Sequence, residues 1–241
     1  MQMLSKLNAH SPMLRTEQPL KIIALGDSLV YGYGDPVGGG WVEQLRRLWM
    51  QEDRHILYNL GIRGDRVFQV AERLEQEFRY RGEIRNRVPD AIILSVGTND
   101  TPRLGRPDGR SFTEFETFQT QMTQLLDQAR QLCPVFFVGM VPVNESKMPF
   151  LDCLYYNHFD QFRYKEFTKH ACQDRQIPYL DLFELWQHRG EDWARSHLSA
   201  DGLHPNGAGY NAILEDVLNW NPLQAFQYAD NLTSPNSMIR L

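Results

Sequence analysis

Short apolar runs alternate with helical patterns along most of this 241-residue chain, and that alternation restricts the fold more than any other feature. Runs of this kind, too brief for helices and rich in β-branched or aromatic residues, predict buried strands. They occupy residues 21–25, 56–60, 91–96, 135–140 and 177–182. The sequence therefore predicts five strands, each apolar on both faces.

The segments between these runs carry apolar residues spaced by threes and fours, which is typical of amphipathic helices. They cover 41–49, 67–78, 115–129 and 213–218, with a less regular candidate at 155–172. Asp65 is a candidate cap for the second helix, and the Ser111 and Glu114 pair has capping-box spacing for the third. Strands alternating with helices predict an α/β fold, with a parallel sheet covered by helices on both sides.

Composition is that of an ordinary globular protein, with 42% hydrophobic and 23% charged residues. A chain of this length and composition buries a sizeable core. We expect one domain over 20–220, between a polar N-terminal flank at 1–19 and a C-terminal tail at 221–241.

Charge and cysteine content exclude several function classes. The formal net charge is -5, without the clustered Lys and Arg that nucleic acid requires. Cys133, Cys153 and Cys172 have no metal-type spacing, and no apolar run suggests a signal peptide or a transmembrane segment. We expect a cytoplasmic protein without metal or cofactor; the sequence predicts no oligomeric state.

Four polar or glycine-containing segments follow the predicted strands. Ser28 comes after the first strand, Gly64 after the second and Asn99 after the third, while Asp201 and His204 precede the last helix. Ligands of parallel sheets bind beyond the carboxyl ends of the strands, so these residues are expected to meet at one edge. A serine, a histidine with a nearby acid and an amide donor are what nucleophilic hydrolysis needs.

His204 differs from the other six histidines because it combines a strand-end setting with an acidic neighbour at short range. Pro205 disfavours a helical backbone at His204 and keeps the segment an extended turn. In that turn Asp201 reaches back to the His204 ring.

Together, GDSL at 26–29, the Gly64 turn, GTND at 97–100 and DGLHPN at 201–206 resemble the blocks of the SGNH/GDSL hydrolase family, in family order. The resemblance implies a three-layer α/β/α sandwich with a flavodoxin-like topology. It also implies ester or thioester hydrolysis without a metal.

The same resemblance assigns roles to individual residues. Ser28 is the implied nucleophile and His204 the base that Asp201 orients. The Ser28 N–H, the Gly64 N–H and the Asn99 amide form the implied oxyanion hole. We therefore expect a serine esterase or acylhydrolase, whether lipase, thioesterase or carbohydrate-ester deacetylase, acting on a small-molecule or lipid ester.

Substrate choice is expected in the outer loops, 101–110 and 142–155. Arg103 contacts an anionic substrate group or belongs to a solvated basic face. The apolar residues of the second loop form an acyl wall or pack onto the sheet. The candidate substrate contacts are Asp27, Tyr31, Arg103, Met148, Phe150 and Tyr155.

Other function classes fit less well. The glycines at 32–40 suggest a nucleotide-binding domain, but no Lys-Ser/Thr pair follows them. An α/β-hydrolase needs glycine two residues after its serine, where this chain has Val30. A catalytically silent binding module with the same fold stays open, and covalent labelling of Ser28 separates it from an enzyme.

Overall fold

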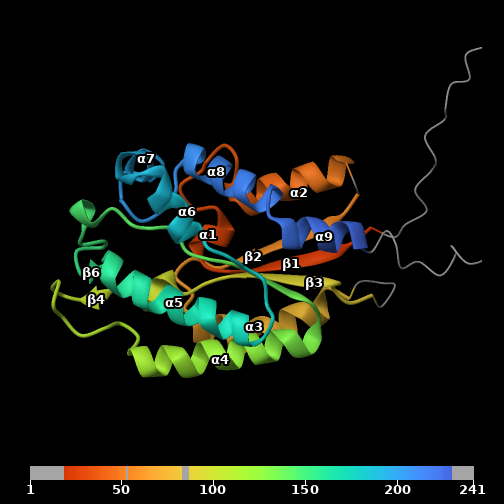
Figure 1. Ribbon diagram of the computed structural model, residues 1–241, viewed down its shortest axis with the longest axis horizontal. Helices are drawn as coiled ribbons and strands as arrows, with labels where there is room; N and C mark the ends of the chain where they lie inside the picture. Colours follow the sequence, from red (N-terminus) through yellow and green to blue (C-terminus); the bar gives the residue numbers. More distant parts are fainter. Residues whose placement is uncertain (1–18, 53, 83–86, 230–241) are drawn as a thin grey trace, which may run out of the picture.

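A five-stranded parallel sheet forms the centre of the computed structural model, which describes residues 19–52, 54–82 and 87–229 (Figure 1). The strand order is β2-β1-β3-β5-β7. These strands are β1 (Lys21–Gly26), β2 (Ile56–Gly61), β3 (Ala91–Ser95), β5 (Val135–Val138) and β7 (Tyr179–Leu180). All five coincide with predicted strands, although the last three are shorter than their apolar runs.

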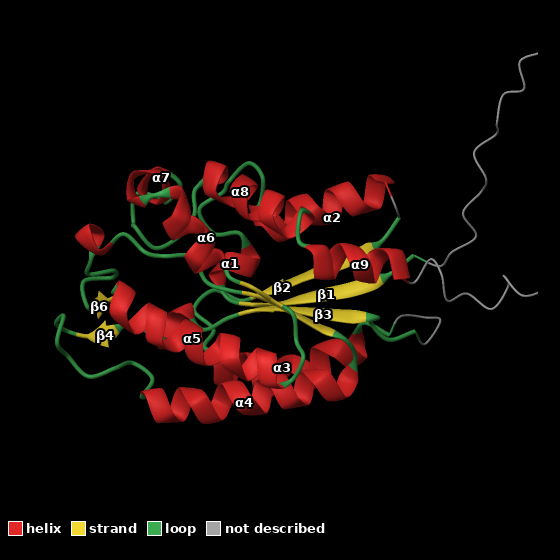
Figure 2. Ribbon diagram, in the orientation of Figure 1, coloured by secondary structure: helices red, strands yellow, loops and turns green. Residues whose placement is uncertain are grey.

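Helices cover both faces of this sheet, as Figure 2 shows. The longer ones are α2 (Gly40–Glu52), α3 (Val67–Tyr80), α4 (Phe115–Leu132), α5 (His158–Asp174) and α8 (Gly207–Leu218). Shorter ones are α1 (Ser28–Tyr31), α6 (Leu182–Arg189), α7 (Glu191–Ser196) and α9 (Asn221–Ala229), with 3₁₀ turns η1 (Thr98–Asp100) and η2 (Glu145–Lys147). The predicted α/β/α sandwich is confirmed.

Two hydrophobic cores separate the three layers. Alternate side chains of β1 point to opposite faces, so Ile22 and Ala24 enter one core while Ile23 and Leu25 enter the other. The first core lies under α1, α2 and α6 to α9, and the second lies under α3, α4 and α5. Both faces of the sheet are therefore dry, which explains why its strands are continuous apolar runs.

The carboxyl ends of the parallel strands meet beside α1. A two-stranded antiparallel ribbon, β4 (Arg103–Leu104) with β6 (Leu154–Tyr155), lies beyond this end (Figure 1). Its strands belong to the two outer loops singled out in the sequence. No helix within the described ranges is long and apolar enough to cross a bilayer.

Three local predictions are wrong. Residues 221–229 form α9 instead of a tail outside the core, because Leu223 is buried and Phe226 packs against the same core. Glu114 is the N-cap of α4 without a side-chain capping bond, while Ser111 bridges to Arg103. Arg66, not Asp65, precedes α3 as its N-cap. The 1–19 flank and the rest of the tail lie outside the described residues, apart from position 19.

Candidate active site

Ser28 stands at the junction of β1 and α1, where the chain turns sharply. A Cβ at Gly26 would lie 1.9 Å from the Ser95 carbonyl oxygen, so only glycine fits at the end of β1. Asp27 then caps α1, its Oδ1 accepting from the Leu29 N–H at 2.9 Å. This turn holds Ser28 at the first helical position, at the carboxyl edge of the sheet.

The segment 201–206 supplies a histidine whose ring is oriented by an aspartate of the same turn. Asp201 Oδ1 accepts from the backbone N–H groups of Leu203 at 2.9 Å and His204 at 3.0 Å. Its Oδ2 lies 2.7 Å from His204 Nδ1. Burial alone would raise the pKa of Asp201, but these bonds hold it below its ordinary value. An ionised Asp201 favours the tautomer with the proton on Nδ1.

His204 completes the connection to the serine. Its Nε2 lies 2.9 Å from Ser28 Oγ, and both side chains are almost fully buried. The Tyr33 ring packs against the imidazole in a T-shaped arrangement, with ring centroids 4.6 Å apart. Ser28, His204 and Asp201 therefore form one chain of hydrogen bonds, in the geometry that lets a histidine accept a serine proton.

Two backbone N–H groups, that of Ser28 itself and that of Gly64 in the loop after β2, are uncommitted. Within the described residues, neither the Ser28 N–H nor the Gly64 N–H has a hydrogen-bond acceptor. Gly64 has φ of +84°, a left-handed conformation that disfavours a side chain. Unpaired N–H groups of this kind are the donors that an oxyanion requires.

Asn99, in η1, carries the third candidate donor. Its Nδ2 donates to the Asp65 carbonyl at 2.9 Å, which uses one of the two amide hydrogens. Its Oδ1 lies 3.4 Å from the Tyr156 hydroxyl, which donates to it. These two contacts fix which end of the amide is the nitrogen.

Tyr156 is therefore a site residue that the sequence did not single out as one. It is only 3% exposed, and burial raises its pKa above the ordinary range, so the hydroxyl stays protonated as a donor. In the sequence it directly follows the second outer loop and is one aromatic residue among several. Nothing in the spacing distinguishes it from its neighbour Tyr155.

Three carboxyl groups near one another lie buried in this part of the fold. Burial raises the pKa of Asp27 to about 7, and the nearby Asp100 and Asp65 add to the effect. Burial also raises the pKa of Asp100 to about 6, against hydrogen bonds from the Val67 N–H and the Thr113 hydroxyl. Asp65 is paired with Arg73 at 2.9 Å. These groups hold the loops that follow β1, β2 and β3.

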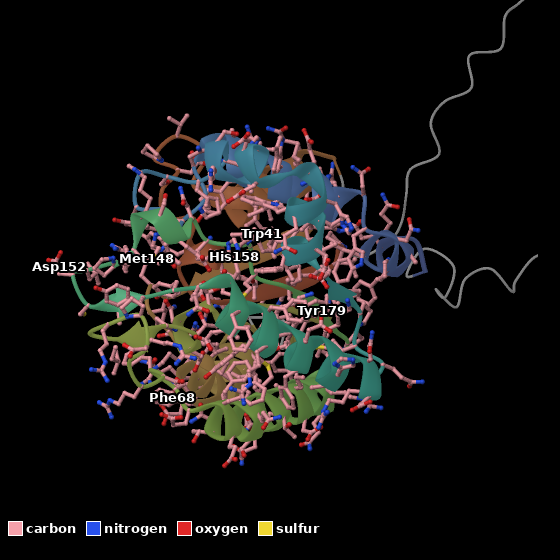
Figure 3. All side chains as sticks on the ribbon, turned by 60° about the vertical axis from the view of Figure 1, so that its left-hand side comes forward. Trp41, Phe68, Met148, Asp152, His158 and Tyr179 are labelled. Atoms are coloured by element: carbon pink, nitrogen blue, oxygen red, sulfur yellow. The ribbon has the colours of Figure 1, made fainter. Side chains whose placement is uncertain are left out.

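The predicted substrate contacts fall into different places. Phe150 lies near the imidazole of His204, with ring centroids 5.7 Å apart. It packs with Met148 against a small core of Val143, Tyr156 and Leu203, separate from the sheet. Figure 3 shows Asp152 at the outer tip of this loop, with Met148 closer to the body of the protein. The loop's apolar residues therefore cover the histidine side of the site.

The remaining predicted substrate contacts differ in how exposed their side chains are. Tyr31 is 54% exposed, whereas Asp27 is buried and serves as the α1 cap. Tyr155 belongs to the β4–β6 ribbon, opposite Arg103. The Arg103 guanidinium forms a two-point ion pair with the buried Asp160, at 2.6 and 2.9 Å. Asp27 and Arg103 thus make contacts that support the fold, and their roles as substrate contacts stay predictions.

One cluster of carboxylates has spacing suited to a metal. Glu166, Asp181 and Glu184 lie close together. Lys165 Nζ, fully buried, already contacts all three at 2.7, 3.0 and 2.8 Å. An internal ammonium group thus supplies the positive charge, and the cluster is structural.

The fold and this constellation define an α/β/α protein with a serine–histidine–aspartate triad at the carboxyl edge of its sheet. Residues 24–212 match the model of the GDSL-like lipase/acylhydrolase family. The chain belongs to this family of hydrolases.

Known proteins resemble this chain in sequence or in fold. The uncharacterized protein YpmR of Bacillus subtilis (strain 168) is 24% identical over 88% of this chain and 84% of its own length. A lipase/acylhydrolase from Enterococcus faecalis has a TM-score of 0.66 at 19% identity, over 83% of this chain and 93% of that one. An acetyl xylan esterase from Geobacillus stearothermophilus gives 0.64 at 15% identity, over 85% and 95%.

Proposed function

We propose that this protein is a serine esterase that hydrolyses an acyl ester through a covalent acyl-serine at Ser28. The observation that carries the proposal is the relay from Ser28 Oγ to His204 Nε2 at 2.9 Å and from His204 Nδ1 to Asp201 at 2.7 Å. A serine hydroxyl is a weak nucleophile until a base accepts its proton. This relay supplies that base in the correct tautomer.

In the first half of the reaction, Ser28 Oγ attacks the carbonyl carbon while its proton passes to His204 Nε2. The carbonyl oxygen gains negative charge, and the N–H groups of Ser28, Gly64 and Asn99 stabilise it. Such donors bind the charged transition state more strongly than the neutral ester, so they raise the rate. When the carbon–oxygen bond to the alcohol breaks, His204 returns the proton to the departing oxygen.

In the second half, water replaces the alcohol. His204, neutral again, takes a proton from the water as it attacks the acyl-serine carbonyl. The carboxylic acid leaves, and Ser28 Oγ recovers its proton from His204. Asp201 stays ionised throughout and stabilises the imidazolium that forms in each half.

Solved relatives support these roles. Catalytic mutants of the Geobacillus stearothermophilus acetylxylan esterase replace a serine, an aspartate and a histidine by alanine, the last two three positions apart. Asp201 and His204 have the same spacing. The Enterococcus faecalis neighbour is a lipase/acylhydrolase, which favours an ester as the substrate.

Covalent labelling with a fluorophosphonate probe tests the proposal. The wild-type protein should be labelled stoichiometrically, and Ser28→Ala should abolish both labelling and ester turnover because it removes only the attacking oxygen. Ser196→Ala, at an exposed position on α7, is the matched control and should label normally.

A panel of p-nitrophenyl esters of graded chain length, with acyl-CoA and acetylated sugars alongside, then separates the ester classes. Wild-type protein that folds but neither labels nor hydrolyses any member of the panel would instead be a silent binding module. Undiminished turnover by Ser28→Ala would place the nucleophile elsewhere.

A further inference from the structure

Arg63 places a positive charge at the mouth of the candidate site. It immediately precedes Gly64 in the loop after β2, and its side chain is exposed. Its guanidinium carbon lies 3.7 Å from the centroid of the Tyr33 ring, against the ring face. The same Tyr33 ring packs against the His204 imidazole in a T-shaped arrangement. Arg63 is thus one aromatic ring away from the proposed base.

The guanidinium keeps its hydrogen-bond donors available in this position. A cation–π contact uses the flat face of the group and none of its N–H bonds. Among the described residues no carboxylate pairs with Arg63, and it makes no hydrogen bond to a side chain or carbonyl. Arg103, by comparison, has its donors occupied by Asp160 and the Gly109 carbonyl.

The position of Tyr33 indicates which part of a substrate Arg63 would meet. His204 must return a proton to the departing alcohol, so the alcohol part of an ester lies beside His204. Tyr33 contacts that imidazole and carries Arg63 on its face. The loop bearing Arg63 also lies against α1, because a Cβ at Gly61 would stand 2.2 Å from the Tyr31 backbone nitrogen. The arginine is therefore held at the alcohol side.

We propose that Arg63, stacked on Tyr33, binds an anionic group on the alcohol part of the substrate, so that the enzyme prefers esters of alcohols bearing a carboxylate or phosphate. The inference rests on the proposed serine esterase function. A guanidinium fork matches the oxygens of either anion and forms two parallel bonds to it. In a protein with a net charge of -5, a local cation at the mouth also draws anions toward the site.

Matched acetyl esters test this selectivity. The acetyl esters of 4-hydroxybenzoate and of 4-hydroxyphenyl phosphate carry the anion on the alcohol, and the acetyl ester of 4-hydroxybenzamide is their neutral partner. The measured quantity is the ratio of kcat/KM for each anionic ester to that for the neutral one. Wild-type protein should favour at least one anionic ester, and Arg63→Gln should lower that ratio by roughly 10-fold to 100-fold, the usual worth of a charge-assisted hydrogen bond.

Two further variants separate charge from geometry. Arg63→Lys keeps the charge but loses the planar fork, so its ratio should fall between those of the wild type and Arg63→Gln. Arg79→Gln removes one exposed cation at the far end of α3, where Arg79 pairs with Glu75, and should leave the ratio unchanged.

Equal ratios for wild-type protein and Arg63→Gln would overturn the inference while turnover of the neutral ester upheld the esterase. A preference seen only with p-nitrophenyl hemisuccinate, whose anion is on the acyl part, would overturn it as well. Absence of turnover of all these esters together with absence of probe labelling would instead remove the esterase function itself.

Discussion

The inner site and the outer loops differ in the contacts that hold them. Around Ser28 the polar groups hold one another at hydrogen-bond distance, from Asp201 through His204 to the serine, and Ser28 and His204 are almost fully buried. The second outer loop has only a small core of its own, and Leu151 at its tip is 70% exposed.

This contrast separates chemistry from selectivity. A reaction that moves a proton between fixed atoms tolerates little displacement, so its residues lie on a rigid sheet edge. A loop with few buried contacts changes its sequence at little cost to the fold, which suits it to choosing a substrate. Changes in the inner site should therefore alter kcat by orders of magnitude, and changes in the outer loops should alter preference among esters.

Asp201→Asn should have the largest effect of the changes that leave the nucleophile in place. An asparagine can keep its oxygen on the two backbone N–H groups, but its NH₂ then faces His204 Nδ1 and forces the proton onto Nε2. That tautomer cannot accept the serine proton, so kcat should fall by on the order of 10⁴-fold. Steady-state kinetics on a short p-nitrophenyl ester measure this; near wild-type activity would mean that another acid orients His204.

Asn99→Ala should lower kcat by on the order of 10²-fold with little change in KM. The reason is that the hydrogen bond from the Asn99 side-chain amide to the oxyanion strengthens only in the transition state. A change confined to KM would make Asn99 a substrate-binding residue instead.

Tyr156→Phe extends that measurement to a positioning residue. It removes only the hydroxyl that holds Asn99 Oδ1, and kcat should fall by roughly 10-fold, within the range expected for one hydrogen bond. In the double variant with Asn99→Ala, the Tyr156 change should add almost nothing. Full additivity of the two effects would show that Tyr156 acts independently of Asn99.

Asp27→Asn tests the buried carboxyl groups through stability. The pKa of Asp27 is raised from 3.8 to about 7, so the folded state holds a proton that the unfolded state releases. The stabilisation from this proton is complete below about pH 4 and is lost as the pH rises through about 7. The wild type should therefore lose stability over this range relative to Asp27→Asn, by on the order of 4 kcal/mol.

Urea unfolding of both proteins at pH 4 and pH 8 measures this difference. For each protein the free energy of unfolding at pH 8 is subtracted from that at pH 4. This subtraction cancels any difference in capping of the Leu29 N–H that does not depend on pH. A constant gap between the variants would show that Asp27 is ionised in the folded protein.

Phe150→Ala should have the smallest effect and a different character. Its ring lies beside His204 and belongs to the small core of the second outer loop. Because the alcohol part of the ester lies beside His204, removing the ring should lower kcat/KM for acetate esters of longer alcohols by a few-fold, about 1 kcal/mol of apolar contact, and affect methyl acetate least. Phe159→Ala, at a site 73% exposed on α5, is the matched control. An equal loss of kcat/KM for esters of every length would mean that Phe150 mainly holds His204 in place.

The sequence by itself determined the parts of this protein whose interactions are local or periodic. Strand positions follow from runs that are apolar on both faces, and the Asp201 to His204 contact follows from three-residue spacing in a turn that Pro205 keeps extended. Serine, glycine and asparagine after successive strands reach one edge because parallel strands share a direction. The family resemblance added roles to the same residues.

Only the tertiary structure decided contacts between segments distant in sequence, because nothing local distinguishes the partners. Tyr156 and its neighbour Tyr155 look alike in the chain, yet one reaches Asn99 and the other pairs with Arg103. Arg103 meets Asp160 across 57 positions, and Arg63 meets Tyr33 from the next loop. The polar composition of 221–229 gave no sign of α9. This helix forms because Leu223 is buried on a core surface that other helices create.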